Sequence, residues 1–374
     1  MALDTPPLRP LWDIFCRVVD NLGDIGVCWR LARQLAAEYP VRVRLWVDAP
    51  EVLAPLLPAF DPALERQEIE GVRIARWQSP LVFEQVADVV IEAFACDPPA
   101  GYLAAMADRP RPPCWVNLEY LSAEPWVAGC HGLASPHRRL PLVKFFCFPG
   151  LVPGTGGLLR EQDLLTRRDA FLAQEGPRRF LMELGLDRAP DTLQVSLFCY
   201  DTAPVADLLA AWREHPASLL CLVPPGKPLA AVQKLLGGGG PWQVGPARLV
   251  PIPFLPQSRF DELLWSCDLN FVRGEDSFVR ALWAARPLVW NLYPQEEAAH
   301  GAKLEAFLDW YEAPAPMAAF WRAWNGLEGN LQATWPGFHA ALPALQDKAC
   351  DRSARLGSEN DLLTTLVKFC ESRV

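Results

Sequence analysis

Short runs of hydrophobic residues alternate along this chain with longer segments whose hydrophobic residues recur at helical spacing. The first pattern is typical of buried strands and the second of amphipathic helices. Because the two alternate through most of the sequence, we predict an α/β protein with parallel sheets. Beyond a first strand that begins near residue 13, strands are expected at 41–48, 72–77, 87–94, 114–120, 192–198, 218–223, 249–254 and 269–272.

The two groups of strands predict two domains of similar size, without an evident sequence repeat between them. Loop-forming residues at 148–157, followed by a charged segment, place the change of domain in this region. The predicted N-terminal domain is 1–178, completed by a C-terminal helix at 356–374, and the predicted C-terminal domain is 179–355. Short helical connections are expected at 81–86 and 102–106, and the turn at 237–240 lacks the Lys-Ser/Thr pair of a phosphate loop.

Composition excludes several classes of protein. With 51% hydrophobic and 21% charged residues, the 374-residue chain is expected to fold into packed domains. No apolar run is long enough to span a membrane and no secretory signal is evident, so a cytoplasmic location is expected. A net charge of −9 argues against a nucleic-acid partner. The 11 cysteines are scattered without CxxC spacing, and the 5 histidines form no pair at helical spacing, so no protein-built metal site is expected.

The segment 13–30 contains the first candidate site. It leaves a hydrophobic run through the polar residues Asp20 and Asn21 and enters a helical pattern near Asp24. In a doubly wound sheet, such a strand-to-helix loop borders the ligand crevice, which makes Asp20 and Asp24 candidates for acid-base chemistry. A simpler interpretation is a turn followed by a helix cap, because Asp and Asn are common in both.

The second candidate site is the polar turn between the strand at 269–272 and the next helix. Asp276 or Ser277 is expected to cap that helix, and a helix N-terminus favours a bound phosphate. Arg273 would add a strong donor to a phosphate oxygen. Glu275 and Asp276 would repel a phosphate, so at least one of them should point elsewhere. A capped helix with solvated charges is again the simpler alternative.

Two further loops follow strands that are expected to be neighbours of this one, at 254–257 and at 287–296. Loops at the same edge of a sheet converge, and an aromatic ring, an amide and an arginine there suit a pyrimidine base and a diphosphate. Two Rossmann-like domains facing a central cleft, with a nucleotide at the C-terminal domain, describe the GT-B glycosyltransferase architecture. The sequence contains no DxD motif, which agrees with sugar transfer that needs no metal ion.

These motifs together resemble the EarP family, the protein-arginine rhamnosyltransferases of elongation factor P. The resemblance lies in WDIFCxVVDNxGDIGVxWRLAxQL at 12–35, FLPQ at 254–257, FVRGEDSFVRAxWA at 271–284 and YPQEE at 293–297. It implies transfer of L-rhamnose from dTDP-β-L-rhamnose to an arginine of elongation factor P, with inversion, with no cofactor beyond this co-substrate and with no nucleic-acid or membrane partner. One departure is Leu22, where many relatives are expected to have Tyr.

Carried over position by position, the resemblance implies that Asp20, Asp24 and Glu275 are the catalytic acids. It also implies a set of donor-binding positions, within which the aromatic pair 198 and 200 is the one that spacing supports least. These positions are Asn21, Leu22, Gly23, Asp24, Phe198, Tyr200, Phe254, Leu255, Gln257, Arg273, Gly274, Glu275, Asp276 and Ser277.

Two other functions remain open from the residues alone. One is a GT-B transferase that uses another nucleotide sugar and acceptor, although a lipid acceptor would call for a basic, apolar surface that this acidic chain does not suggest. The other is a non-catalytic nucleotide-binding module in which the three carboxylates are solvated or capping groups.

Overall fold

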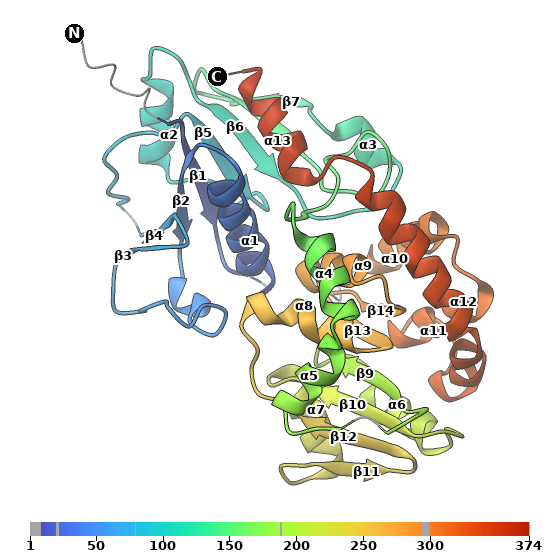
Figure 1. Cartoon of the computed structure of the whole chain (residues 1–374). Helices are drawn as coiled ribbons and strands as arrows, with labels where there is room; N and C mark the ends of the chain where they lie inside the picture. The colour runs from blue at the N-terminus through green and yellow to red at the C-terminus, as the bar shows by residue number, and fades with distance from the viewer. Residues whose placement is uncertain (1–8, 20–21, 79, 188, 294–298, 374) are drawn as a thin grey trace. The chain divides into compact units, whose positions relative to one another are not determined.

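The computed structural model describes residues 9–19, 22–78, 80–187, 189–293 and 299–373 (Figure 1). The chain divides into two compact units, unit 1 with residues 1–162 and 360–374 and unit 2 with residues 163–359. The boundaries therefore differ from the predicted 178/179 and 355/356. The first differs because helix α4 (Leu164–Ala173) packs on α5 (Gly176–Glu183) and α8 (Gln257–Ser266) of unit 2. The second differs because α12 (Leu331–Gly357) continues without interruption past residue 355.

Unit 1 is built on a sheet with the strand order β3-β4-β2-β1-β5-β6-β8-β7. The strands from β4 to β8 in this order are parallel, and β3 and β7 join the two edges antiparallel. Its strands are β1 (Leu11–Cys16), β2 (Arg42–Val47), β3 (Arg66–Ile69), β4 (Val72–Arg76), β5 (Val89–Ala93), β6 (Cys114–Leu118), β7 (Ala134–Pro136) and β8 (Val143–Cys147). Its helices are α1 (Leu22–Glu38), the 3-10 helix η1 (Pro50–Leu53), α2 (Ala100–Ala107), α3 (Trp126–Cys130) and α13 (Leu362–Glu371).

Both faces of the unit 1 sheet are covered, which explains why its central strands read as continuous hydrophobic runs. On one face, Ile14 of β1 belongs to a core shared with α1 and α13. On the other face, Phe15 of β1 belongs to a second core that includes Tyr102 of α2. The C-terminal helix α13 therefore completes the packing of unit 1 through residues such as Leu363.

Unit 2 contains a sheet with the strand order β11-β12-β10-β9-β13-β14. All neighbouring pairs are parallel except β11 with β12. Its strands are β9 (Leu193–Leu197), β10 (Leu219–Val223), β11 (Trp242–Val244), β12 (Ala247–Pro251), β13 (Leu269–Arg273) and β14 (Leu288–Asn291). Besides α4, α5, α8 and α12, its helices are α6 (Val205–Arg213), α7 (Lys227–Leu236), α9 (Asp276–Trp283), α10 (Ala299–Tyr311) and α11 (Ala315–Trp324).

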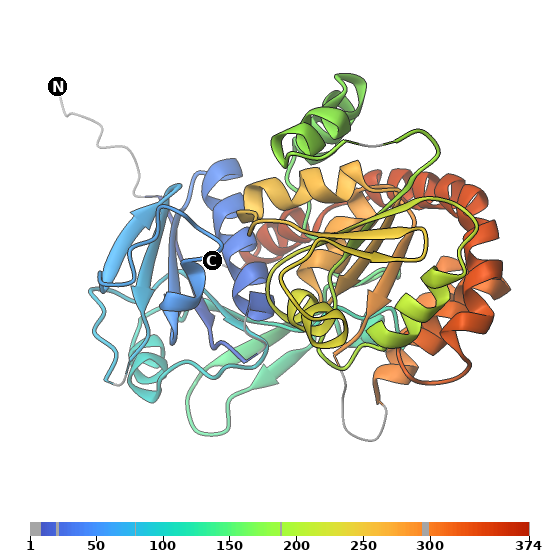
Figure 2. The same ribbon diagram turned by 90° about the horizontal axis from the view of Figure 1, so that it is seen from below.

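Helices also cover both faces of the unit 2 sheet. Leu222 of β10 packs with α5 and α8, and Figures 1 and 2 show α4 and α5 on the same side of this sheet as α8. On the other face, the ring of Phe271 on β13 contacts Trp212 of α6 and Trp324 of α11. Most of the tryptophans are therefore core residues. The predicted α/β class with parallel sheets is confirmed in both units.

The predicted helix at 81–86 is wrong. This segment has no regular structure, although Leu81 and Phe83 pack against the second core of unit 1. Three arginines from elsewhere in unit 1, Arg66, Arg44 and Arg109, donate hydrogen bonds to the carbonyls of residues 82, 85 and 86. Because long-range donors satisfy these carbonyls, the segment needs no helical hydrogen bonds.

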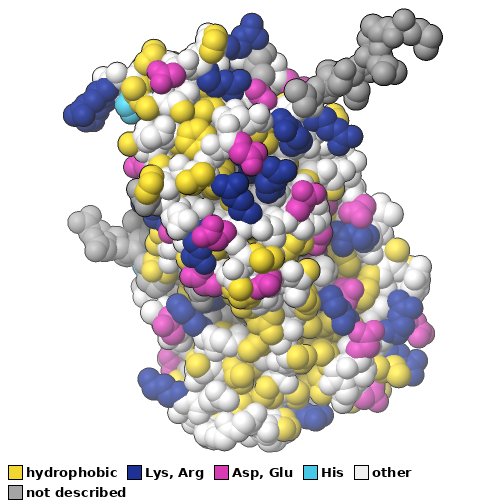
Figure 3. All heavy atoms as spheres, turned by 90° about the vertical axis from the view of Figure 1, so that its left-hand side faces the viewer, with side chains coloured by type: hydrophobic (Ala, Val, Ile, Leu, Met, Phe, Trp, Pro, Cys, Tyr) yellow, Lys and Arg dark blue, Asp and Glu magenta, His cyan; other side chains and the backbone are white. Residues whose placement is uncertain are grey.

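Charges of both signs are mixed on the face shown in Figure 3, where lysine and arginine side chains lie among aspartates and glutamates. Within the described residues, no helix combines the length and the apolarity that are needed to cross a bilayer.

Candidate active site

The strand order of unit 2 identifies the edge at which a ligand is expected. From β9 the chain moves outward through β10 and β12, and it then returns to place β13 on the other side of β9. The loops after β9 and β13 therefore leave the sheet in opposite directions, and such a switch point is the usual ligand crevice of an open α/β sheet. Phe198 and Tyr200 follow β9, whereas Arg273 ends β13. The tertiary structure thus brings these two predicted groups together.

Arg273 is held between two aromatic rings. Its guanidinium carbon lies 4.7 Å from the ring centroid of Phe198 and 4.8 Å from that of Tyr200. Stacking of this kind orients the planar guanidinium. The Nη1 atom of Arg273 is buried and has no hydrogen-bond partner among the described residues. A buried N–H donor without a partner is unfavourable, so this atom is poised to bind an acceptor such as a phosphate oxygen.

The turn after Arg273 leads directly into α9. Gly274 adopts a φ of +59°, a conformation that glycine reaches without strain, and its carbonyl accepts a hydrogen bond of 2.7 Å from Nε1 of Trp290. Ser277 does not cap the helix as predicted. Its hydroxyl accepts a 3.1 Å hydrogen bond from the Arg273 amide and also donates to the Arg273 carbonyl. The N-cap position is Glu275, so Ser277 fixes the turn and places the positive end of α9 beside Arg273.

The two carboxylates of this turn are paired with cations. Glu275 lies 3.0 Å from Nζ of Lys303 on α10. Asp276 accepts a 2.9 Å hydrogen bond from Nε of Arg280 and a 3.3 Å hydrogen bond from Nε2 of Gln257. Because both carboxylates are compensated, the repulsion of a phosphate that their sequence position suggested is offset. In the described part of the chain, no three His, Cys, Asp or Glu side chains gather in a way that could hold a metal ion.

The loop from β12 to α8 lies at the same edge of the unit 2 sheet. Gln257, the first residue of α8, is buried, whereas the Phe254 side chain is 42% exposed and Leu255 packs on the adjacent core. Phe260 of α8 contacts the Phe198 ring at 5.6 Å. An exposed aromatic side chain beside a buried amide suits a nucleobase, which needs a stacking surface and a hydrogen-bonding partner. Of the motif at 293–297, only Tyr293 is described, and its ring contacts Tyr200 at 5.4 Å.

In unit 1, the switch point lies between β1 and β5, and Asp24 is in the first turn of the helix that follows β1. The Asp24 side chain is buried, with 3% of the residue exposed. It accepts hydrogen bonds from the Val19 amide at 2.9 Å and from the Tyr120 hydroxyl at 3.4 Å. Leu22 and Gly23 begin α1, whereas the predicted residues Asp20 and Asn21 lie outside the described residues.

Several residues of this region were not found from the sequence. Asp48, which follows β2, accepts a 2.9 Å hydrogen bond from the Val18 amide. The ring of Phe94, after β5, stacks on Tyr120 at 4.3 Å, and Phe94 has a φ of +57°. Burial raises the pKa of Glu119 above its usual range, although Asn117 opposes the shift by donating a hydrogen bond. Polar residues directly after the strand at 114–118 were the signal that could have indicated this loop.

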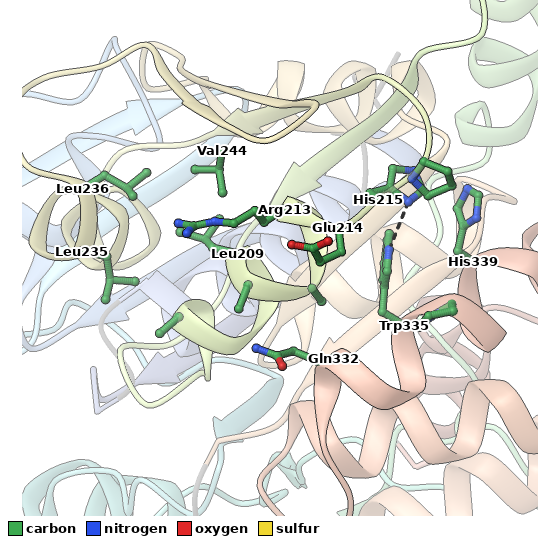
Figure 4. Close-up of a pocket in the computed structure, with 15 residues that line it drawn as sticks. Leu209, Arg213, Glu214, His215, Leu235, Leu236, Val244, Gln332, Trp335 and His339 are labelled. Atoms are coloured by element: carbon green, nitrogen blue, oxygen red, sulfur yellow. Dashed lines mark hydrogen bonds between the residues drawn. The ribbon is translucent and has the colours of Figure 1, made fainter.

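A pocket of about 590 Å³ lies elsewhere in unit 2 (Figure 4). It is lined by the end of α6, the end of α7 and the start of α12, and it contains His215 and His339. Because α6 runs from the end of β9 back to the start of β10, this pocket is at the N-terminal edge of the sheet, opposite to the loops that carry Arg273. We therefore do not assign it to the donor.

Comparisons with known proteins identify the family of this chain. The family model described as "Elongation-Factor P (EF-P) rhamnosyltransferase EarP" matches residues 12–371. A protein-arginine rhamnosyltransferase of Pseudomonas putida is 47% identical over 97% of this chain and 99% of its own. The corresponding protein of Pseudomonas aeruginosa is 47% identical over 96% of this chain and 98% of its own.

Solved structures extend the comparison to the fold. One that is described as the structural basis for EarP-mediated arginine glycosylation of translation elongation factor EF-P is 34% identical, with a TM-score of 0.68, and covers 98% of this chain and 100% of that chain. MurG of Acinetobacter baumannii is 11% identical with a TM-score of 0.54 over 98% of this chain and 99% of its own. The GT-B fold class that the sequence predicted is therefore confirmed. With a family match over nearly its whole length, the chain belongs to the EarP family of elongation factor P rhamnosyltransferases.

Proposed function

We propose that this member of the family transfers L-rhamnose from dTDP-β-L-rhamnose to a guanidinium nitrogen of one arginine of elongation factor P, with inversion and without a metal ion. Family membership makes the chain a protein-arginine rhamnosyltransferase. The proposal adds the nucleotide, the stereochemical course and the metal independence. We also propose that it acts in the cytoplasm, because its acceptor is a translation factor.

The observation that supports this donor most directly is the environment of Arg273. A guanidinium that is stacked between two rings, with a buried N–H lacking a partner among the described residues, lies beside the positive end of α9. As the bond from the sugar to the diphosphate breaks, negative charge develops on the departing dTDP. Arg273 and the start of α9 would stabilise that charge, which is the task that a divalent cation performs in metal-dependent transferases.

The acceptor poses a different problem, because an arginine side chain stays protonated and its lone pairs are delocalised. We assign Asp20 as the general base. In the transfer step, a guanidinium nitrogen forms a bond to C1 of rhamnose, the bond from C1 to the diphosphate oxygen breaks, and its electron pair leaves with dTDP. Asp20 accepts the proton that the nitrogen loses. Attack opposite to the leaving group inverts the configuration at C1.

The remaining carboxylates have supporting roles in this mechanism. Asp24 is buried and accepts the Val19 amide, so it holds the backbone that leads directly into Asp20. Glu275 is partly exposed and is assigned to bind the other nitrogens of the guanidinium, as a carboxylate of opposite charge can do. These assignments leave Asp20 as the carboxylate that takes the proton.

The test is to incubate the purified protein with dTDP-β-L-rhamnose and elongation factor P in excess EDTA and to record the intact mass of the acceptor. We expect a gain of one deoxyhexose, on an arginine that fragmentation identifies, and an anomeric carbon-hydrogen coupling that reports the α configuration. Transfer that requires added Mg²⁺ would refute metal independence. A β product would refute inversion, and transfer from only another nucleotide sugar would refute the donor.

A further inference from the structure

We propose that Lys303 is a positioning residue for the transfer reaction, which holds the Glu275 carboxylate ionised and in place at the start of α9. Nζ of Lys303 lies 3.0 Å from Oε1 of Glu275. Neither the sequence motifs nor the loops of the predicted donor site include Lys303, which is on α10. The inference rests on the proposed function, because it gives a role to a residue that acts through Glu275.

The packing of α10 on α9 brings Lys303 and Glu275 together. Lys303 and Phe307 are one turn apart on α10, and Glu275 and Phe278 are three residues apart at the start of α9, so each pair shares one helix face. The rings of Phe307 and Phe278 contact each other at 5.0 Å. That contact fixes α10 against α9, as the two neighbouring helices in Figure 1 illustrate, and it brings Lys303 to Glu275.

A third element fixes the lysine side chain. Trp290 of β14 stacks on Phe278 at 3.9 Å, and Nζ of Lys303 lies 5.8 Å from the Trp290 ring centroid. The Trp290 indole also donates to the Gly274 carbonyl, directly before Glu275. The aromatic ring that supports Lys303 therefore also holds the turn that carries its partner.

Burial distinguishes this pair from an ordinary surface ion pair. The side chains of Lys303 and Glu275 are 19% and 16% exposed. Exposed pairs contribute little because water and salt screen them, whereas a pair shielded in this way keeps more of its attraction. Lys303 therefore compensates the negative charge of Glu275. In the proposed mechanism this carboxylate is near the anionic donor, and it must remain charged in order to bind the acceptor guanidinium.

Other charged groups lie on the elements that pack against this pair. On α9, Asp276 is paired with Arg280. On α10, Glu305 is paired with Arg322 of α11, and His300 lies one turn before Lys303. On β13, Arg273 is stacked between Phe198 and Tyr200.

Unit 2 offers a matched control in Lys348 of α12. Lys348 is also paired with a glutamate, Glu312 at 3.4 Å, and it also lies over an aromatic ring, Tyr311 at 5.9 Å. Glu312 is 72% exposed and is not part of the site. Lys303→Met and Lys348→Met therefore remove the same kinds of interaction at two places, and only the first is next to the predicted catalytic acid. Glu312 keeps a second partner in Arg352, at 2.7 Å. Lys303→Arg keeps the charge.

The experiment measures kcat/KM for elongation factor P between pH 5 and 8, with saturating dTDP-β-L-rhamnose, together with the thermal midpoint of each variant. For Lys303→Met we expect kcat/KM at pH 7 to fall about tenfold, and the acid limb of the profile to move to higher pH by about one unit or more, since an adjacent cation favours the ionised carboxylate. Lys303→Arg should restore the acid limb of the pH profile to its wild-type position, and Lys348→Met should leave that limb unchanged. In the Glu275→Gln background, Lys303→Met should cause no further loss.

The outcomes separate the two proposals. If the wild-type protein transfers rhamnose but Lys303→Met lowers the rate equally at every pH, or if Lys348→Met shifts the limb as much, Lys303 has only a structural role and the inference is overturned. A loss from Lys303→Met that is undiminished in the Glu275→Gln background also overturns it, because Lys303 then does not act through Glu275. Absence of any transfer by the wild-type protein would instead refute the proposed function, and this inference with it.

Discussion

The guanidinium carbon of Arg273 lies 4.8 Å from the ring centroid of Tyr200, although Tyr200 follows β9 and Arg273 ends β13. Tyr200 is itself fixed by its amide, which donates a 2.8 Å hydrogen bond to Oδ1 of Asn291 at the end of β14. The loops after β9, β13 and β14 are thus tied together at one edge, and the arginine is oriented before any ligand binds. Such pre-organisation is what a diphosphate site requires.

Replacing Arg273 should chiefly weaken donor binding. For Arg273→Met we expect dTDP affinity to fall about 10-fold to 100-fold, the range that corresponds to a hydrogen bond to a charged group. Arg273→Lys should recover only part of the loss, because lysine lacks the planar group that stacks between the two rings. Titration calorimetry with dTDP measures both variants. An unchanged dissociation constant for Arg273→Met would contradict the assignment.

Replacing Asp20 should separate chemistry from binding. For Asp20→Asn we expect turnover to fall by about two to four orders of magnitude, which is typical for the loss of a general base. The dTDP affinity should stay close to that of the wild-type protein, because the diphosphate is assigned to unit 2. Single-turnover mass measurements and calorimetry give the two quantities. Weak dTDP binding by a folded Asp20→Asn protein would make Asp20 a binding residue.

Asp48 should matter for turnover although it lies outside the sequence motifs. It accepts the Val18 amide and Asp24 accepts the Val19 amide, so two carboxylates anchor the backbone directly before Asp20. Asp48→Ala removes one anchor, and a small displacement of a catalytic group can cost up to about 100-fold in rate. Asp48→Asn keeps an acceptor oxygen and should be much milder. Equal rates for Asp48→Ala and the wild-type protein, measured at saturating donor, would exclude this role.

Unit 2 should lose stability in mild acid because of His215. Burial and the neighbouring His339 lower the pKa of His215 to about 4, and its Nδ1 accepts a 3.3 Å hydrogen bond from the Trp335 indole, so the fold favours the neutral ring (Figure 4). Between this value and the unfolded pKa of about 6.5, the unfolded chain binds more protons. The contribution of His215 is therefore complete above about pH 6.5 and is lost as the pH falls toward 4.

The measurement is the urea midpoint of unfolding at pH 7.5 and at pH 5. We expect a lower midpoint at pH 5 for the wild-type protein and a smaller difference for His215→Gln, which can still accept from Trp335 but does not titrate in this range. An identical pH dependence in both proteins would show that other groups control the acid loss.

The sequence by itself determined the α/β fold class and the division of the strands into two groups. Hydrophobic runs such as those of β5 and β10 are buried at every position, as is typical of parallel strands that are covered on both faces. It also determined which loops belong at the ligand edge of unit 2. Parallel strands place all their C-terminal ends at one edge, so the order of the strands predicted that the loops at 254–257, 273–277 and 287–296 would converge there. Phe198 was assigned only through the family resemblance.

Tertiary structure decided the details that depend on partners far away in the chain. The segment 81–86 is irregular because arginines of other elements bind its carbonyls, and α4 belongs to unit 2 because of its packing on α8. Lys303 reaches Glu275, and Asp48 reaches the Val18 amide, only through the packing of separate elements. Periodicity and local propensity carry information about near neighbours along the chain, whereas these ion pairs and hydrogen bonds form between residues that only folding brings together.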